Sequence, residues 1–186
     1  MEGSDKQEKG KKKVTKIKIF PVPLNSRAIK ENICITTNSD KKSSKEKIIS
    51  QGIKFHQQGN ISEAAKYYQY AIKQGFNDEI VFSNYGVILE SLGKLEEAEL
   101  YIRKAVALRP NFAKAHLNLG NVLKGLGKLQ DAELSTRKAT KLNPNFANAH
   151  LNLGTILKDL GKLHEAELST RTAIKLNPSF VAAYSN

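Results

Sequence analysis

The residues best suited to recognition in this sequence are asparagines that recur at a fixed interval of 34 residues. A carboxamide carries one acceptor and two donors, so it can bond the C=O and N–H groups of an extended peptide whatever that peptide's sequence. Leucines stand directly before two of these asparagines and would add apolar contact. The sequence therefore predicts a peptide-binding surface that comprises Asn84, Asn118, Asn152, Asn186, Asn121, Leu117 and Leu151.

Two other interpretations of this asparagine column stay open. Asn118 and Asn152 lie in nearly duplicate segments and could match for that reason alone, or the amides could cap local backbone. Asn84 lies in a more diverged segment and is still asparagine. Its persistence favours the binding interpretation.

The four histidines do not form a catalytic or metal site in the sequence. His116 and His150 occupy equivalent places in two similar segments, where we expect them to pack against a neighbouring helix. His56 and His164 are each isolated among polar residues, with no cysteine or paired carboxylate at ligand spacing. We therefore expect a protein that is not an enzyme and that uses no cofactor or metal.

Two further recurring patterns have structural explanations. The Gly-Lys pairs lack the first glycine and the Ser/Thr of a phosphate loop, so they predict turns between helices. These pairs are Gly93-Lys94, Gly127-Lys128 and Gly161-Lys162. Glu-Arg pairs four residues apart indicate a solvated helix face, with each pair worth about 0.2–0.5 kcal/mol. They are Glu99/Arg103, Glu133/Arg137 and Glu167/Arg171.

The elements that carry these residues follow from a 34-residue period. Residues 113–146 and 147–180 agree at about three positions in four, and the period extends back through 79–112 to a weaker unit at 45–78. Each unit has two apolar stripes at helical spacing, separated by a small polar turn and closed by a proline in the later units. Gly86, Gly120 and Gly154 are small enough to let the two helices approach closely. Neither helix can bury its stripe alone, so the units must stack.

These motifs resemble the tetratricopeptide-repeat (TPR) family over residues 45–180. The family pattern is met in the third unit by His116, Leu119, Gly120, Leu123, Ala132, Ala139 and Pro144. The aromatic residue that the family places on the second helix is kept as Tyr68 but becomes Ile102, Thr136 and Thr170 in later units, which should loosen that contact. The resemblance implies an all-α, right-handed superhelix whose concave side is lined by the asparagine column, like the asparagine ladder of O-GlcNAc transferase.

The segments outside the units read differently. Residues 1–44 carry eleven basic and five acidic residues, half of the net charge of +12, and we expect a mostly disordered or loosely attached extension. Residues 14–37 could instead form a small hairpin, and 38–44 read as a linker. Residues 181–186 would begin a truncated fifth unit, and the open edge before them should favour self-association.

The sequence thus favours a protein-interaction scaffold for a protein or extended peptide. One alternative is the substrate-recruiting part of a glycosyltransferase, sulfotransferase or oxygenase, by similarity to bacterial TPR arrays that precede such domains. A nucleic-acid binder is disfavoured, because no aromatics interleave the basic run. The lone Cys34, together with the absence of a signal peptide or an 18-residue apolar run, indicates a cytoplasmic protein that does not enter membranes.

Overall fold

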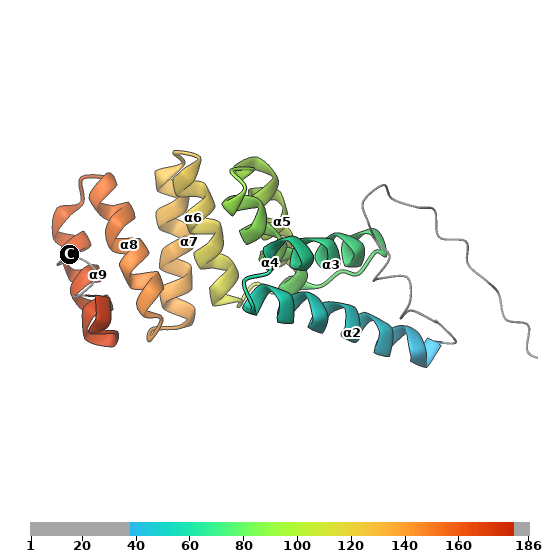
Figure 1. Cartoon of the computed structure of the whole chain (residues 1–186). Coiled ribbons are helices and arrows are strands. Elements are labelled where there is room, and N and C mark those ends of the chain that lie inside the picture. Colours follow the sequence, from blue (N-terminus) through green and yellow to red (C-terminus); the bar gives the residue numbers. More distant parts are fainter. Residues whose placement is uncertain (1–37, 181–186) are drawn as a thin grey trace, which may run out of the picture. The chain divides into compact units, whose positions relative to one another are not determined.

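A computed structural model of the protein describes residues 38–180, and the expected hairpin at 14–37, the extension before it and Asn186 lie outside that range. The described part is all α-helix and turn, with no strand (Figure 1). Its eight helices are α2 (Asn38–Gln57), α3 (Ile61–Lys73), α4 (Glu79–Ser91), α5 (Leu95–Leu108), α6 (Ala113–Gly125), α7 (Leu129–Leu142), α8 (Ala147–Asp159) and α9 (Leu163–Leu176). The eight helices predicted for residues 45–180 are confirmed.

The chain divides into two compact units, Met1–Lys47 and Ile48–Asn186. In the first, the described residues are the beginning of α2, which is helical from Asn38. The prediction of a linker over residues 38–44 is therefore wrong. Asparagine, serine and aspartate favour the first turn of a helix, and the lysines that follow are good helix formers, so this polar segment can extend α2.

The helices begin and end where the residue types require it. At the start of α4 the Asp78 carboxylate accepts hydrogen bonds from the backbone N–H groups of Ile80 and Val81. The predicted turns at Gly59, Gly93, Gly127 and Gly161 all have φ between 73° and 74°, where glycine is favoured. The residues before the prolines, Arg109, Asn143 and Asn177, leave the helical region with φ between −142° and −136°.

Within each unit the two helices approach as closely as the predicted glycines allow. A Cβ atom at Gly120 would lie 2.1 Å from the Thr136 Oγ1 atom and 3.3 Å from the carbonyl oxygen of Ala132. Gly86 meets Ile102 in the same way, and Gly154 meets Thr170. Thr136 is fully buried, and its hydroxyl donates to the carbonyl of Ala132 at 2.8 Å. The glycine is therefore required by the helix contact.

Stacking of successive units buries apolar side chains that a single unit would leave exposed. One core cluster joins Leu117, Ala139 and Ala149 from α6, α7 and α8, and Phe146 packs against it. The first helices of successive units also contact one another directly, α4 with α6 and α6 with α8. We call α4, α6 and α8 the first-helix row, and α5, α7 and α9 the second-helix row. The first-helix row forms a continuous surface that carries the asparagine column.

Candidate peptide-binding surface

The three described asparagines of the column orient their amides alike. Each Nδ2 group donates toward the preceding unit: Asn84 to the Tyr68 hydroxyl at 3.1 Å, Asn118 to the Ser83 hydroxyl at 3.1 Å, and Asn152 to the Asn121 Oδ1 atom at 2.6 Å. All three partners are side chains, so these bonds do not cap local backbone. The column is a repeated contact between units as well as a row of amides.

The Oδ1 atoms of Asn84, Asn118 and Asn152 accept no hydrogen bond from the described residues. Asn118 is only 8% exposed, whereas Asn84 and Asn152 are half-buried. Among residues 44–180, no fully buried side-chain nitrogen or oxygen atom is left without a hydrogen bond, so the Asn118 Oδ1 atom must keep access to solvent. Asn84 and Asn152 therefore present an acceptor that a ligand can reach, whereas the Asn118 acceptor is much less exposed.

The two leucines beside the column differ from each other. Leu117 is 5% exposed because it belongs to the core cluster with Ala139 and Ala149. Most of its surface cannot touch a peptide, contrary to its predicted contact. Leu151 is half-buried, as is Asn121. The apolar part of the candidate surface is thus smaller than the sequence indicates.

Two polar residues that were not predicted as partners, Tyr68 and His56, continue the hydrogen bonds of the column into the first unit, where Tyr68 is fully buried and supports the column from beneath. The Tyr68 hydroxyl, bonded by Asn84, also lies 3.5 Å from the His56 Nδ1 atom. Burial raises the pKa of Tyr68 and lowers the pKa of His56, and the positive charge of Lys114 lowers the His56 pKa further. The one sequence signal was Tyr68 itself, the aromatic that only the first unit keeps.

Charged residues also lie on the helices of the first-helix row. Lys124 of α6 and Asp159 of α8 form an ion pair at 3.6 Å. Glu90 of α4 is half-buried, and this burial raises its pKa. These helices therefore carry charged groups of both signs in addition to the amides.

The second-helix row carries an ion-pair network that was predicted only in part. The pairs Glu99/Arg103 and Glu133/Arg137 form, but the same glutamates also accept from lysines of the next unit's turn, Lys128 and Lys162, both at 2.7 Å. The side chains of Glu99 and Glu133 are only 14% and 12% exposed, so these two glutamates do not belong to a solvated helix face. The Glu167/Arg171 pair, at 55% and 75%, does fit that description.

This network perturbs the glutamate carboxyls. The hydrogen bond from Lys128 is the main cause that lowers the pKa of Glu99, and Arg103 lowers it further, while burial opposes them. At Glu133 burial is the largest single effect and raises the pKa, but the bonds from Lys162 and Arg137 together outweigh it, so the pKa is lowered. Lys128 and Lys162 thus fasten their units to the preceding ones, whereas Lys94 of the first Gly-Lys turn pairs with Glu97 of its own unit.

The histidines of the third and fourth units have a structural role, but it is a hydrogen bond to a loop and not the packing against a neighbouring helix that was predicted. The Nε2 atom of His116 lies 2.9 Å from the Pro110 carbonyl oxygen, and that of His150 lies 2.9 Å from the Pro144 carbonyl oxygen. Each ring ties a helix to the loop before it. Among residues 38–180, no three His, Cys, Asp or Glu side chains gather to hold a metal ion, and no helix there is long and apolar enough to cross a membrane.

Family comparisons agree with this architecture. Three family models, each described as Tetratricopeptide repeat, match residues 51–116, 113–146 and 136–167, and together they span more than half of the chain. The chain belongs to the tetratricopeptide-repeat family. A search of curated proteins finds no match.

Solved structures share the fold. MamA (residues 41 to the end) from Desulfovibrio magneticus RS-1 has a TM-score of 0.65 and 21% identity, over 76% of this chain and 80% of its own. YrrB, described as a TPR protein with an unusual peptide-binding site, has a TM-score of 0.65 and 22% identity, over 79% and 76%. The first TPR of Spaghetti (RPAP3), bound to the HSP90 peptide SRMEEVD, has a TM-score of 0.59 and 26% identity, over 63% and 93%.

Proposed function

We propose that this protein is an interaction scaffold that binds an extended polypeptide along the first-helix row. The observation that carries the proposal is the common orientation of Asn84, Asn118 and Asn152: each Nδ2 group donates one hydrogen bond to the preceding unit, and each Oδ1 acceptor is left unused by the described residues. An extended peptide presents backbone N–H groups at regular spacing, and such groups suit a row of acceptors. Recognition of this kind depends little on the peptide's side chains.

The energies set the expected strength of binding. Each hydrogen bond between a column amide and the peptide contributes about 0.5–1.5 kcal/mol. Three such bonds supply roughly 2–4 kcal/mol of the ~8 kcal/mol of binding free energy in a micromolar complex. Asn121 and Leu151 border the same row and would add to this total. We therefore expect weak binding that tolerates changes of peptide sequence.

Two of the similar structures support this proposal, because each is associated with a peptide. YrrB is described with a peptide-binding site, and the first TPR of Spaghetti (RPAP3) is bound to a peptide. Both share the fold of this chain, in which the first helices form one surface. A polypeptide is thus the partner class that the fold and the amide column favour together.

The experiment begins with selection of 12-residue peptides from a random display library on the full chain, followed by titration calorimetry. Replacing both half-buried asparagines, Asn84→Ala and Asn152→Ala, should weaken a selected peptide roughly five- to hundredfold, because two hydrogen bonds are lost. Asn111→Ala, in the exposed loop before α6, is the matched control and should bind normally. Equal affinity of the double variant and the control would refute the proposal.

A further inference from the structure

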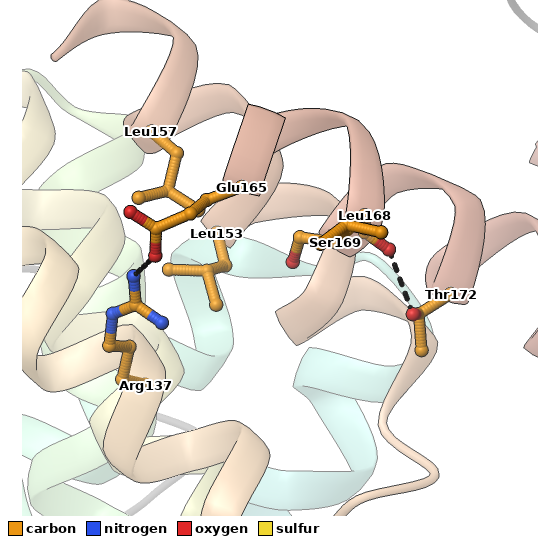
Figure 2. A pocket seen from close by; sticks show the side chains of 7 residues that line it. All are labelled: Arg137, Leu153, Leu157, Glu165, Leu168, Ser169 and Thr172. Atoms are coloured by element: carbon orange, nitrogen blue, oxygen red, sulfur yellow. Dashed lines mark hydrogen bonds and ion pairs between the residues drawn. The ribbon is translucent and has the colours of Figure 1, made fainter. Parts of the chain in front are cut away.

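A cleft of about 220 Å³ opens on the opposite, second-helix row, between α7 and α9 and over α8. Leucines of α8 and α9 line it, an arginine and a glutamate form an ion pair at its rim, and a serine lies at its other side (Figure 2). These residues are Leu153, Leu157, Leu168, Arg137, Glu165 and Ser169. In Figure 2 the Leu153 side chain lies between Arg137 and Ser169.

The same place two periods earlier in the chain is filled by two aromatic rings. Leu153 corresponds to Tyr85 and Ser169 to Tyr101, and these tyrosine rings meet edge to face with centroids 5.0 Å apart. Gln69, which corresponds to Arg137, donates to the Tyr85 hydroxyl at 2.8 Å. The Lys104 ammonium lies 5.0 Å from the centroid of Tyr101. The fold therefore holds aromatic rings at this position when the sequence supplies them.

The third unit, with Leu119 and Ser135, and the fourth unit, with Leu153 and Ser169, both lack these rings, and in the fourth unit a cleft remains. The replacements by Leu153 and Ser169 keep an apolar wall but remove ring volume, and Leu168 at its edge is 53% exposed. A cavity of about 150 Å³ lined by apolar side chains is known to hold benzene. A cleft of about 220 Å³ therefore has room for one phenol ring.

One rim group, the Arg137 guanidinium, can face an aromatic ring, although two carboxylates share its charge. Arg137 forms ion pairs with Glu133 and Glu165. Burial lowers the pKa of Arg137, but the two carboxylates raise it by more, so the guanidinium stays positively charged. Cations are attracted to the electron-rich face of aromatic rings, as Lys104 is to Tyr101 in the second unit.

The hydroxyl groups at the cleft favour a ring that carries a donor. Ser169 Oγ donates to the His150 carbonyl at 2.9 Å, and Thr172 Oγ1 donates to the Leu168 carbonyl at 2.9 Å. Each has used its proton within the protein, so each oxygen can only accept from a ligand. A phenol O–H satisfies such an acceptor, whereas a phenyl ring does not.

We propose that this cleft binds a tyrosine side chain presented by a partner polypeptide. It is a second site, on the row opposite the asparagine column, and it does not depend on the peptide binding proposed there. The partner's ring fills the space that the two tyrosine rings fill in the second unit, with its hydroxyl toward Ser169 and Thr172.

The test follows backbone amide shifts of the full chain by two-dimensional NMR, with N-acetyl-tyrosine methylamide as the probe. Shifts should concentrate on residues 165–172 and saturate with a dissociation constant on the order of millimolar. N-acetyl-phenylalanine methylamide should bind roughly two- to tenfold more weakly, because one hydrogen bond is missing. Shifts elsewhere, or equal binding of the two probes, would overturn the proposal.

Variants show whether the cleft itself is responsible. Ser169→Tyr refills the cleft as Tyr101 does and should abolish the shifts, whereas Ser135→Tyr, the same change one unit earlier, should leave them. Arg137→Gln removes the cation without filling the cleft and should weaken binding. This variant still tests the proposal if Ser169→Tyr does not fold. Unchanged binding in folded Ser169→Tyr or in Arg137→Gln contradicts the proposal. Binding of free p-cresol without binding of the tyrosine derivative would also overturn it, because the site would then accept only a small phenol.

Discussion

Asn118 holds two units together, so replacing it should cost stability whether or not a peptide is present. Its Nδ2 group donates to the Ser83 hydroxyl at 3.1 Å, and Ser83 is fully buried. Asn118→Ala removes this donor and leaves a buried hydroxyl with one fewer partner, which costs about 1–3 kcal/mol. For a protein of this size each kcal/mol lowers the unfolding midpoint by about 2–4 °C, so we expect a fall of roughly 2 to 12 °C.

A double-mutant cycle with Ser83→Ala isolates this contact. Removing both partners leaves no unsatisfied group, so the double variant should be less destabilised than the sum of the single variants by about 0.5–1.5 kcal/mol. Thermal melts followed by circular dichroism measure all four proteins, with Asn111→Ala as the exposed control. A zero coupling energy, or an Asn118→Ala protein that melts like the parent, would refute this explanation of its burial.

The remaining predictions concern packing and charge. Gly120→Ala places a Cβ atom 2.1 Å from the Thr136 Oγ1 atom and should destabilise the array by about 1–3 kcal/mol in denaturant melts. Adding Thr136→Ala should recover part of this loss, and Gly125→Ala, whose Cβ atom meets only the flexible Leu95 side chain at 3.2 Å, should be much milder. Equal effects at the two glycines would contradict the close helix contact. The folded pKa of Glu99 lies below its ordinary value of 4.5, so its contribution to stability is present above pH 4.5 and is lost as the pH falls through the folded value. The variant Lys128→Gln should lose less of its stability than the parent when melts are repeated at decreasing pH, and identical pH profiles would count against this ion pair.

The helices and turns could be predicted from the sequence because their causes are local. Gly127 and Pro144 mark a turn and a helix end within a few residues, and the apolar stripes repeat at helical spacing. Gly120 was assigned correctly because a small residue recurs where two helices must meet. The helical residues 38–44 were missed, since a polar segment without a stripe resembles a linker.

The site was predicted less completely, because side-chain partners depend on how the units stack. The sequence places Asn118 in a column, but only the stacked helices bring its amide to Ser83 and bury Leu117 in the core. The contact of Lys128 with Glu99 joins residues 29 apart. The same offset recurs between Glu133 and Lys162, so this signal was present in the sequence, but it has no meaning until the stacking is known.

The central claim, that the Oδ1 atoms of the column accept N–H groups from an extended peptide, is tested most directly by backbone methylation. Successive N–H groups of an extended chain point to opposite sides, so only every second amide can face the column. A selected peptide is therefore prepared in two forms, N-methylated at either its odd or its even residues, and both are titrated by calorimetry. We predict that one form loses binding while the other keeps it, and that the difference shrinks in the Asn84→Ala, Asn152→Ala protein. Equal binding of both forms, or an undiminished difference in that variant, would contradict the claim.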